Sequence, residues 1–196
     1  MNNSPSLRER KRQRARERIV EAAYELFAAR GFGDVTVADI AGRAEVGRST
    51  FFRYFGDKQE VVFADEQRLW DLALRRTNGT QQPADLAAAV ALLRPVVVGV
   101  CRDMTRDPDH YLAHERLIRR TPELYDRNLR KLMDFAAAMR DGLVERGAAP
   151  SDAALAAQLA LACYAAARDT AGAAPERLAV TVAANFDQLA TIGRPR

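Results

Sequence analysis

The stretch that decides the fold runs from residue 36 to residue 58 and reads TVADIAGRAEVGRSTFFRYFGDK. Thr36 is a good helix N-cap, and Asp39 three residues later can complete the cap. Apolar residues then recur at helical spacing until a break that contains a glycine. A second short helix follows from about Arg48 to Phe55. Two short helices joined by a tight turn predict a helix-turn-helix.

The second helix of this stretch sorts its residues onto two faces. Phe51 and Phe55 are four apart and share one face, so we expect them to point into the core. The other side chains then cover the outer and N-terminal parts of the helix. They offer donors for base edges, hydroxyls for phosphates and an exposed ring suited to a thymine methyl. The candidate DNA-binding residues on this helix are Arg48, Ser49, Thr50, Phe52, Arg53 and Tyr54.

The positive charge of the chain gathers around the same segment. The 196 residues carry a formal net charge of +4. Residues 1–58 contain twelve Lys+Arg and eight Asp+Glu, whereas the rest of the chain contains eighteen of each. Seven basic residues crowd between Arg8 and Arg18. Two interpretations stay open for them: a solvated flexible arm, or an arm that reaches DNA phosphates or the minor groove.

Helical periodicity continues along the remainder of the chain. An apolar pattern over residues 19–27 ends at Gly31, a normal residue after a helix C-cap. Asp107-Pro108 and Thr121-Pro122 each combine an N-cap with proline at the first helical position. No strand-like alternation is present. We therefore predict an all-α protein of about nine helices, with an N-terminal three-helix helix-turn-helix domain over residues 1–58 and a larger helical domain over residues 59–196.

The stretch from about Ile19 to Lys58 resembles the DNA-binding domain of the TetR family, in both spacing and residue types. The resemblance implies that Thr36 and Val37 open the second helix at the DNA backbone and that Lys58 contacts a phosphate. It also implies a sequence-specific regulator, a ligand-responsive repressor that binds an operator of two half-sites as a homodimer. A plain basic three-helix module is the alternative, but it leaves the shared placement of charge and exposed side chains unexplained.

Two positions depart from the usual pattern of that family. Glu45 stands where the turn often has glycine, which predicts a strained backbone of about 1 kcal/mol. Phe52 stands where tyrosine is commoner, so the hydroxyl that would bond a phosphate is missing.

The last two helices are candidates for a dimer interface. The final helix spaces its apolar residues by four and three, as in a coiled-coil seam, and the alanine-rich helix before it permits close approach. In the family that the chain resembles, two such helices per subunit form a four-helix interface. An ordinary core within one chain is the alternative. The candidate interface residues are Leu155, Leu159, Leu178, Val182, Asn185, Leu189 and Ile192.

A small-molecule effector pocket is expected among the helices from Ala84 to Arg168. An apolar lining with arginines at its mouth suits a ligand with an apolar tail and an anionic head, and residues 115–124 resemble a family branch suited to acyl-CoA-like ligands. Solvated arginines with a flat apolar ligand are the alternative. The candidate pocket residues are Val96, Val97, Val100, His110, His114, Arg116, Arg120, Phe135 and Met139.

Several other classes of protein are disfavoured by the sequence. No nucleophile–base pair and no glycine-rich phosphate loop is evident, so we expect no enzyme, no catalytic residue and no cofactor. His110 and His114 lack a third ligand, so no metal is expected. A non-specific binder of nucleic acid or anionic membrane remains the rival for the arginine-rich segment.

The cysteines and the apolar content indicate the expected compartment. Cys101 and Cys163 lie in apolar surroundings and form neither a disulfide framework nor a zinc motif. No apolar run of about 18 residues and no secretory signal is present. We therefore expect a cytoplasmic protein without a membrane partner, whose partners are double-stranded operator DNA, a second copy of the chain and an effector.

Overall fold

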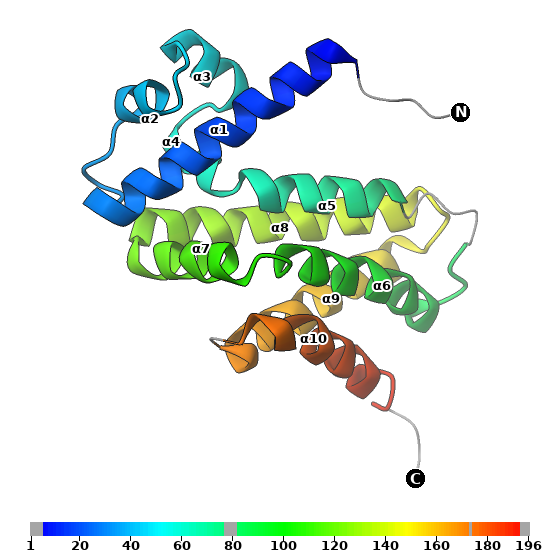
Figure 1. Ribbon diagram of the computed structural model, residues 1–196. Helices are drawn as coiled ribbons and strands as arrows, with labels where there is room; N and C mark the ends of the chain where they lie inside the picture. The colour runs from blue at the N-terminus through cyan, green and yellow to red at the C-terminus, as the bar shows by residue number, and fades with distance from the viewer. Residues whose placement is uncertain (1–5, 77–81, 173, 193–196) are drawn as a thin grey trace. The chain divides into compact units, whose positions relative to one another are not determined.

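The computed structural model describes residues 6–76, 82–172 and 174–192, and these residues form ten helices and no strand (Figure 1). The predicted all-α class is confirmed, with one helix more than the nine expected. The chain divides into two compact units, one up to Asp65 and one from Glu66 onward. None of the described helices combines the length and the apolar character needed to cross a membrane.

The N-terminal unit contains four helices and the beginning of a fifth. These are α1 (Leu7–Arg30), α2 (Val37–Arg43), α3 (Arg48–Tyr54), α4 (Lys58–Val62) and the first residues of α5 (Ala64–Arg76). Helix α2 packs against both α1 and α3, and α4 packs against α1 (Figure 1). Gly31 has a φ of 81° and ends α1, as the sequence predicted.

The expectation of an N-terminal arm is wrong for the described part of that segment, because Arg8–Arg18 is the first half of α1. Arginine, glutamine, glutamate and alanine are all good helix formers, so this composition favours a helix once one end is anchored. Gln13 Nε2 also donates to Glu17 Oε1 at 2.8 Å, one helical turn away. The basic side chains are therefore held at fixed positions along a helix.

Helix α4 is fastened to α1 at its C-terminal end. Tyr24 Oη donates to the carbonyl of Val62 at 3.2 Å, and Arg16 Nη2 donates to the carbonyl of Ala64 at 2.8 Å. Val61, Val62 and Phe63 are buried. The compact N-terminal unit therefore extends to Asp65, beyond the boundary expected at residue 58.

The C-terminal unit continues α5 and adds five helices. These are α6 (Leu86–Met104), α7 (Pro108–Arg120), α8 (Pro122–Val144), α9 (Pro150–Ala171) and α10 (Pro175–Leu189). Helix α9 packs against α6, α8 and α10 (Figure 1). Its buried face is mostly alanine, which allows neighbouring helices to approach closely. Helix α6 continues through Pro95 without ending.

Candidate functional site

The turn between α2 and α3 is fixed by backbone bonds at the end of α2. Val46 N donates to the carbonyl of Ala41 at 2.9 Å, and Glu45 N donates to the carbonyl of Gly42 at 3.1 Å. These two bonds form a Schellman motif, which requires a left-handed residue after the C-cap. Glu45 is that residue, with a φ of 53°, which is the left-handed conformation on which the predicted strain depends.

The start of α2 is fixed by side chains. Thr36 and Asp39 form the reciprocal capping box that the sequence predicted. Hydrogen bonds from Thr36 hold the pKa of the Asp39 carboxyl below its ordinary value, and Arg30 contributes with its Nη1 atom 3.4 Å away. Thr36 is exposed and Val37 is half-buried, so both lie at the N-terminal end of α2 where a backbone phosphate can approach.

Helix α3 turns its polar residues outward. Phe51 and Phe55 are buried, as predicted, whereas the side chain of Phe52 is 50% exposed. Arg53 Nη2 donates to Thr50 Oγ1 at 3.2 Å, and its guanidinium lies 5.5 Å from the centre of the Tyr54 ring. The residues predicted to bind DNA fall into two groups, with Arg48, Ser49, Phe52 and Arg53 exposed and Thr50 and Tyr54 half-buried.

A basic groove lies beside α3. It has a volume of about 650 Å³ and brings the C-terminal end of α3 together with the first half of α1. The sequence indicated that the arginines are basic, but it did not show that they share a groove with Tyr54. An extended arm would not place them there, whereas one helix does. The lining residues are Arg10, Arg12, Gln13, Arg14, Arg16, Glu17 and Tyr54.

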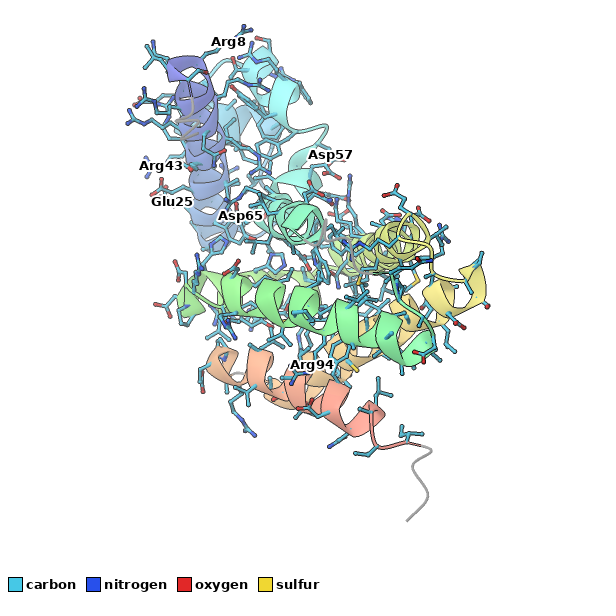
Figure 2. The ribbon with its side chains drawn as sticks, turned by 90° about the vertical axis from the view of Figure 1, so that its right-hand side faces the viewer. Arg8, Glu25, Arg43, Asp57, Asp65 and Arg94 are labelled. Carbon is cyan, nitrogen blue, oxygen red and sulfur yellow. The ribbon has the colours of Figure 1, made fainter. Side chains whose placement is uncertain are left out.

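The charged groups of α1 and α2 also meet away from this groove. Arg43 Nη2 lies 2.7 Å from Glu25 Oε2, and Figure 2 shows the two labelled side chains next to each other. Both side chains are about half exposed, so this pair is screened by water.

Lys58 has a different placement from the one that the resemblance implied. Its Nζ atom donates to the carbonyls of Phe32 at 2.7 Å, Val35 at 3.0 Å and Gly33 at 3.4 Å. The same atom lies 4.3 Å from the centre of the Phe32 ring. An ammonium group has three donors, and three carbonyls occupy them here. Lys58 therefore holds the loop between α1 and α2 and has no donor left for a phosphate in this conformation.

The predicted dimer seam on α10 mostly faces the core of its own chain. Leu178 and Val182 are fully buried, and Leu189 packs against the same core. Asn185 Nδ2 donates to the carbonyl of Cys163 on α9 at 2.9 Å. The four-three spacing of α10 thus serves packing against α6 and α9 at Leu178 and Val182, whereas half-buried Asn185 and Leu189 stay predicted interface residues. Leu155 and Ile192 are exposed, and Leu159 is half-buried.

The predicted effector residues separate into a buried set and an exposed set. Val97, Val100, Phe135 and Met139 belong to one buried apolar cluster; Val96 and His114 are also buried, and His110 is half-buried. Arg116 and Arg120 are exposed on α7. The structure therefore does not bring these two arginines together with the apolar residues, because they occupy the opposite face of α7 from Tyr111 and Ile118.

Buried polar side chains do meet inside the C-terminal unit, in a group that we call the interior cluster: Glu66, Trp70, His114, Glu115, Tyr164 and Arg168. Arg168 Nη2 lies 2.6 Å from Glu115 Oε1, and His114 Nε2 lies 3.7 Å from Glu66 Oε2. Burial opposes ionisation of Glu66, but the neighbouring His114, Arg168 and Lys131 outweigh it and lower the pKa of that carboxyl. Burial also raises the pKa of the Cys101 thiol beside the cluster to about 12.

Only His114 of this cluster was singled out as a pocket residue from the sequence. The spacing of some other members in the sequence is a signal that could have identified them. Glu66 and Trp70 are four apart on α5, and Tyr164 and Arg168 are four apart within alanine-rich α9. Paired polar residues on an otherwise apolar face are unusual in a core. Within the described residues, no three groups that could ligate a metal converge.

Most of the N-terminal unit matches a known protein family. Residues 19–64 match the family model described as bacterial regulatory proteins, tetR family. The transcriptional regulator TcmR of Streptomyces glaucescens is 37% identical over 134 residues, which cover 66% of this chain and 58% of that protein. The transcriptional repressor LfrR of Mycolicibacterium smegmatis is 34% identical over 87 residues, which cover 43% and 45%. The chain thus spans about half the length of these curated relatives.

Solved structures share the fold over most of the chain. SmeT, the repressor of a Stenotrophomonas maltophilia multidrug efflux pump, is 21% identical in its triclosan complex, with a TM-score of 0.57 over 89% of this chain and 88% of that one. Thermus thermophilus FadR with lauroyl-CoA is 23% identical, with a TM-score of 0.55 over 92% and 96%. Together with the helix-turn-helix geometry, the family match identifies residues 19–64 as a tetR-family region, and the solved structures show that most of the chain shares their fold.

Proposed function

We propose that this protein is a sequence-specific DNA-binding transcription regulator, a ligand-responsive repressor that binds an operator of two related half-sites as a homodimer. The observation that carries the proposal is the surface of α3. Arg48, Phe52 and Arg53 are exposed, while Phe51 behind them is fully buried and fixes the helix. Relatives named as transcriptional regulators support the same function.

The chemistry of this surface fits the major groove. A guanidinium can donate two hydrogen bonds to guanine, so Arg48 and Arg53 are the candidates for base recognition. Phe52 offers an apolar contact to a thymine methyl, since its exposed ring gains little in water. The exposed arginines of α1 supply the phosphate contacts that any DNA-binding protein needs.

The homodimer is proposed to form through the outward faces of α9 and α10. Leu155 on α9 and Val180 on α10 are large exposed apolar residues, and Val180 is 70% exposed. Ala162 and Ala184 are exposed on the same two helices, so their faces are flat enough for close helix packing. This outward face replaces the Leu178 and Val182 seam, which the core of the chain already uses.

The effector is proposed to bind within the C-terminal unit. The structures of SmeT with triclosan and of FadR with lauroyl-CoA show that proteins of this fold hold small molecules. An acyl-CoA-like effector is the alternative that Arg116 and Arg120 support. Because both are exposed, they would meet an anionic head group at the protein surface, where water weakens the attraction.

Selection of bound sequences from random DNA tests the DNA-binding function. We expect one motif in two related copies, and Arg48→Ala should cost ~1–3 kcal/mol and relax the preference at one position of each copy. The matched control is Arg130→Ala, which removes an exposed arginine from α8. If the unaltered protein enriches no motif, the proposal is wrong.

The substitution Val180→Asp tests whether the protein assembles as a homodimer through this face. It should give monomers in sedimentation at micromolar concentration with an unchanged helical spectrum. Operator affinity should then fall by about 10²-fold, because two linked DNA-binding units no longer act together. Leu178→Asp should instead unfold the C-terminal unit, since Leu178 is fully buried. A Val180→Asp protein that remains a dimer would contradict the proposed interface.

A further inference from the structure

The basic groove beside α3 is lined by one face of the first half of α1. Residues three, four and seven positions apart lie on the same side of an α-helix, so their side chains project together. The residues on this face are Arg10, Gln13, Arg14 and Glu17. Two further arginines of the lining, Arg12 and Arg16, lie one turn apart beside this face. A single helix thus places four guanidinium groups around a volume of about 650 Å³.

The walls of the groove are held in place by contacts within the N-terminal unit. Arg16 is half-buried; its Nη2 atom donates to the carbonyl of Ala64 at 2.8 Å, and its guanidinium lies 5.4 Å from the centre of the Phe55 ring. Tyr54, the last residue of α3, is also half-buried and closes the groove from the other side. The exposed arginines earlier in α1 therefore stand on a fixed helix, so a partner does not first have to order a flexible arm.

The charge of the groove indicates the kind of partner that it fits. Its described lining contains four arginines and one carboxylate, that of Glu17. Gln13 Nε2 donates to Glu17 Oε1 at 2.8 Å, so the carboxylate already has a partner within the helix. Guanidinium groups pair well with phosphate oxygens. Because these groups are spread along a helix face, each can meet a different phosphate of one strand, which favours a phosphate chain over a single small anion.

We propose that the basic groove binds the sugar–phosphate backbone of double-stranded DNA beside each half-site, whatever the base sequence there. The proposal rests on the proposed function: with α3 in the major groove of DNA, that helix lies between two backbones, and Tyr54 at its end places the basic groove next to one of them. Arg10, Arg12 and Arg14 pair with phosphates, and the Tyr54 hydroxyl donates to one. Sequence preference stays with α3, because phosphate contacts fix the register without reading bases.

The opposite face of α1 supplies matched controls. Lys11 and Arg18 are exposed basic residues of the same helix, and neither is among the described lining residues of the groove. At 3.6 residues per turn, both point away from the side that carries Arg10 and Arg14. A general attraction between DNA and positive charge depends on both faces alike. Binding in the basic groove depends on one face only.

The salt dependence of DNA binding by the full-length protein tests this difference. The variants are Arg10→Gln and Arg14→Gln in the groove, with Lys11→Gln and Arg18→Gln as controls. Each is titrated against the motif enriched from random DNA and against a duplex of unrelated sequence. Each groove substitution should lower the slope of log affinity against log salt by about 1 and weaken binding to both duplexes by about tenfold at 0.1 M salt. The controls should leave the slope unchanged. Glutamine is a good helix former, and circular dichroism checks that α1 stays helical.

Two further substitutions should give effects of other kinds. Glu17→Gln removes the carboxylate from the described lining and should strengthen binding to both duplexes, an increase that a loss of folding cannot imitate. Tyr54→Phe removes a neutral donor, so it should weaken binding while the salt slope stays the same.

Chemically altered DNA locates the contacted phosphate. In a series of duplexes, single phosphates beside the half-site are replaced by uncharged methylphosphonates. Arg10→Gln should cost nothing on the duplex that lacks the phosphate which Arg10 contacts, because the ion pair is already absent there.

Each contrary outcome overturns the proposal. Equal losses from Arg10→Gln and Lys11→Gln mean a diffuse attraction to α1, and no loss from any of the four variants means that this half of α1 stays away from DNA. A loss at Arg10 that no single methylphosphonate removes means that no phosphate is held there. Tighter binding of a single strand than of the duplex means another nucleic-acid partner. Absence of an enriched motif contradicts the regulator function instead, and the unrelated duplex still tests the basic groove in that case.

Discussion

The two units of the protein place their polar groups in opposite locations. In the N-terminal unit the arginines of α1 and α3 lie outside, over an apolar core that contains Ile19, Phe51 and Phe55. Among the described residues, the buried polar or charged side chains all belong to the C-terminal unit, and so do the buried atoms without a hydrogen-bond partner; the buried residues are Glu66, His114, Glu115 and Asn128.

This difference indicates two kinds of recognition. A surface of solvated arginines attracts a polyanion from a distance and releases counterions on contact. Under the proposed function, an effector that pairs with the buried polar groups of the interior would offset part of their cost in stability. Matched substitutions at exposed and at buried polar residues should therefore have different effects on stability and on binding.

The largest contrast should come from two ion pairs of similar length. Glu115 and Arg168 are 10% and 13% exposed, whereas Glu25 and Arg43 are 48% and 59% exposed. Glu115→Ala should lower the free energy of unfolding of the C-terminal unit by about 3–5 kcal/mol, since it leaves Arg168 buried without its partner. Glu25→Ala should cost less than about 1 kcal/mol.

Urea denaturation measures both effects. Trp70 fluorescence follows the C-terminal unit, because this residue is the single tryptophan, and circular dichroism follows the whole chain. The double substitution Glu115→Leu with Arg168→Met should recover most of the loss, because it removes both charges together. A cost below about 1 kcal/mol for Glu115→Ala would show that the buried pair behaves like a surface pair.

A smaller difference in stability should distinguish Lys58 from Arg53, two basic residues of the N-terminal unit. Lys58→Met leaves three carbonyls of the α1–α2 loop without their donor and should cost about 1–3 kcal/mol in thermal or urea unfolding. Arg53→Ala changes an exposed side chain, so it should alter stability by no more than about 0.5 kcal/mol while weakening DNA binding.

The salt dependence of DNA binding decides the role of Lys58. A phosphate contact would lower the slope of log affinity against log salt by about 1 when the charge is removed. A structural lysine leaves that slope unchanged in the fraction that is folded. Unchanged stability together with a lower slope would restore the phosphate contact that the family resemblance implied.

The smallest expected effect is a gain at the turn before α3. Glu45→Gly should stabilise the N-terminal unit by about 0.5–1 kcal/mol, because glycine adopts the observed φ of 53° without strain but costs more entropy to order. Glu45→Ala keeps the β-carbon and should give no such gain. Equal unfolding midpoints for Glu45→Gly and the unaltered protein would show that the Schellman turn is unstrained.

The fold of the N-terminal unit could be predicted because its signals are local. A cap, an apolar face and a break lie within 23 residues, from Thr36 to Lys58, and each acts on its near neighbours. The error at Arg8–Arg18 came from charge, which indicates exposure but does not distinguish a helix from an arm. The placement of Lys58 could not be predicted locally, because it contacts residues more than twenty positions away.

The sequence was sufficient to predict that the C-terminal unit is helical. It was not sufficient to predict which face of each helix packs within the chain. The four-three spacing of α10 describes a packed helix equally well whether its partner belongs to the same chain or to another. Leu178 and Val182 turned out to pack within the chain. The interior cluster combines α5, α7 and α9, and contacts between helices so distant in sequence leave only the weak signal of paired polar positions.

The start of helix α5 connects an anchor of helix α1 directly to the interior cluster. The carbonyl of Ala64 accepts the hydrogen bond from Arg16 on the basic helix, and Glu66 contributes its carboxylate to the interior cluster. The two positions are two residues apart, about 3 Å along a helix axis. The anchor of the arginine-rich helix and the first residue of the interior cluster are therefore joined by two peptide units of one helix.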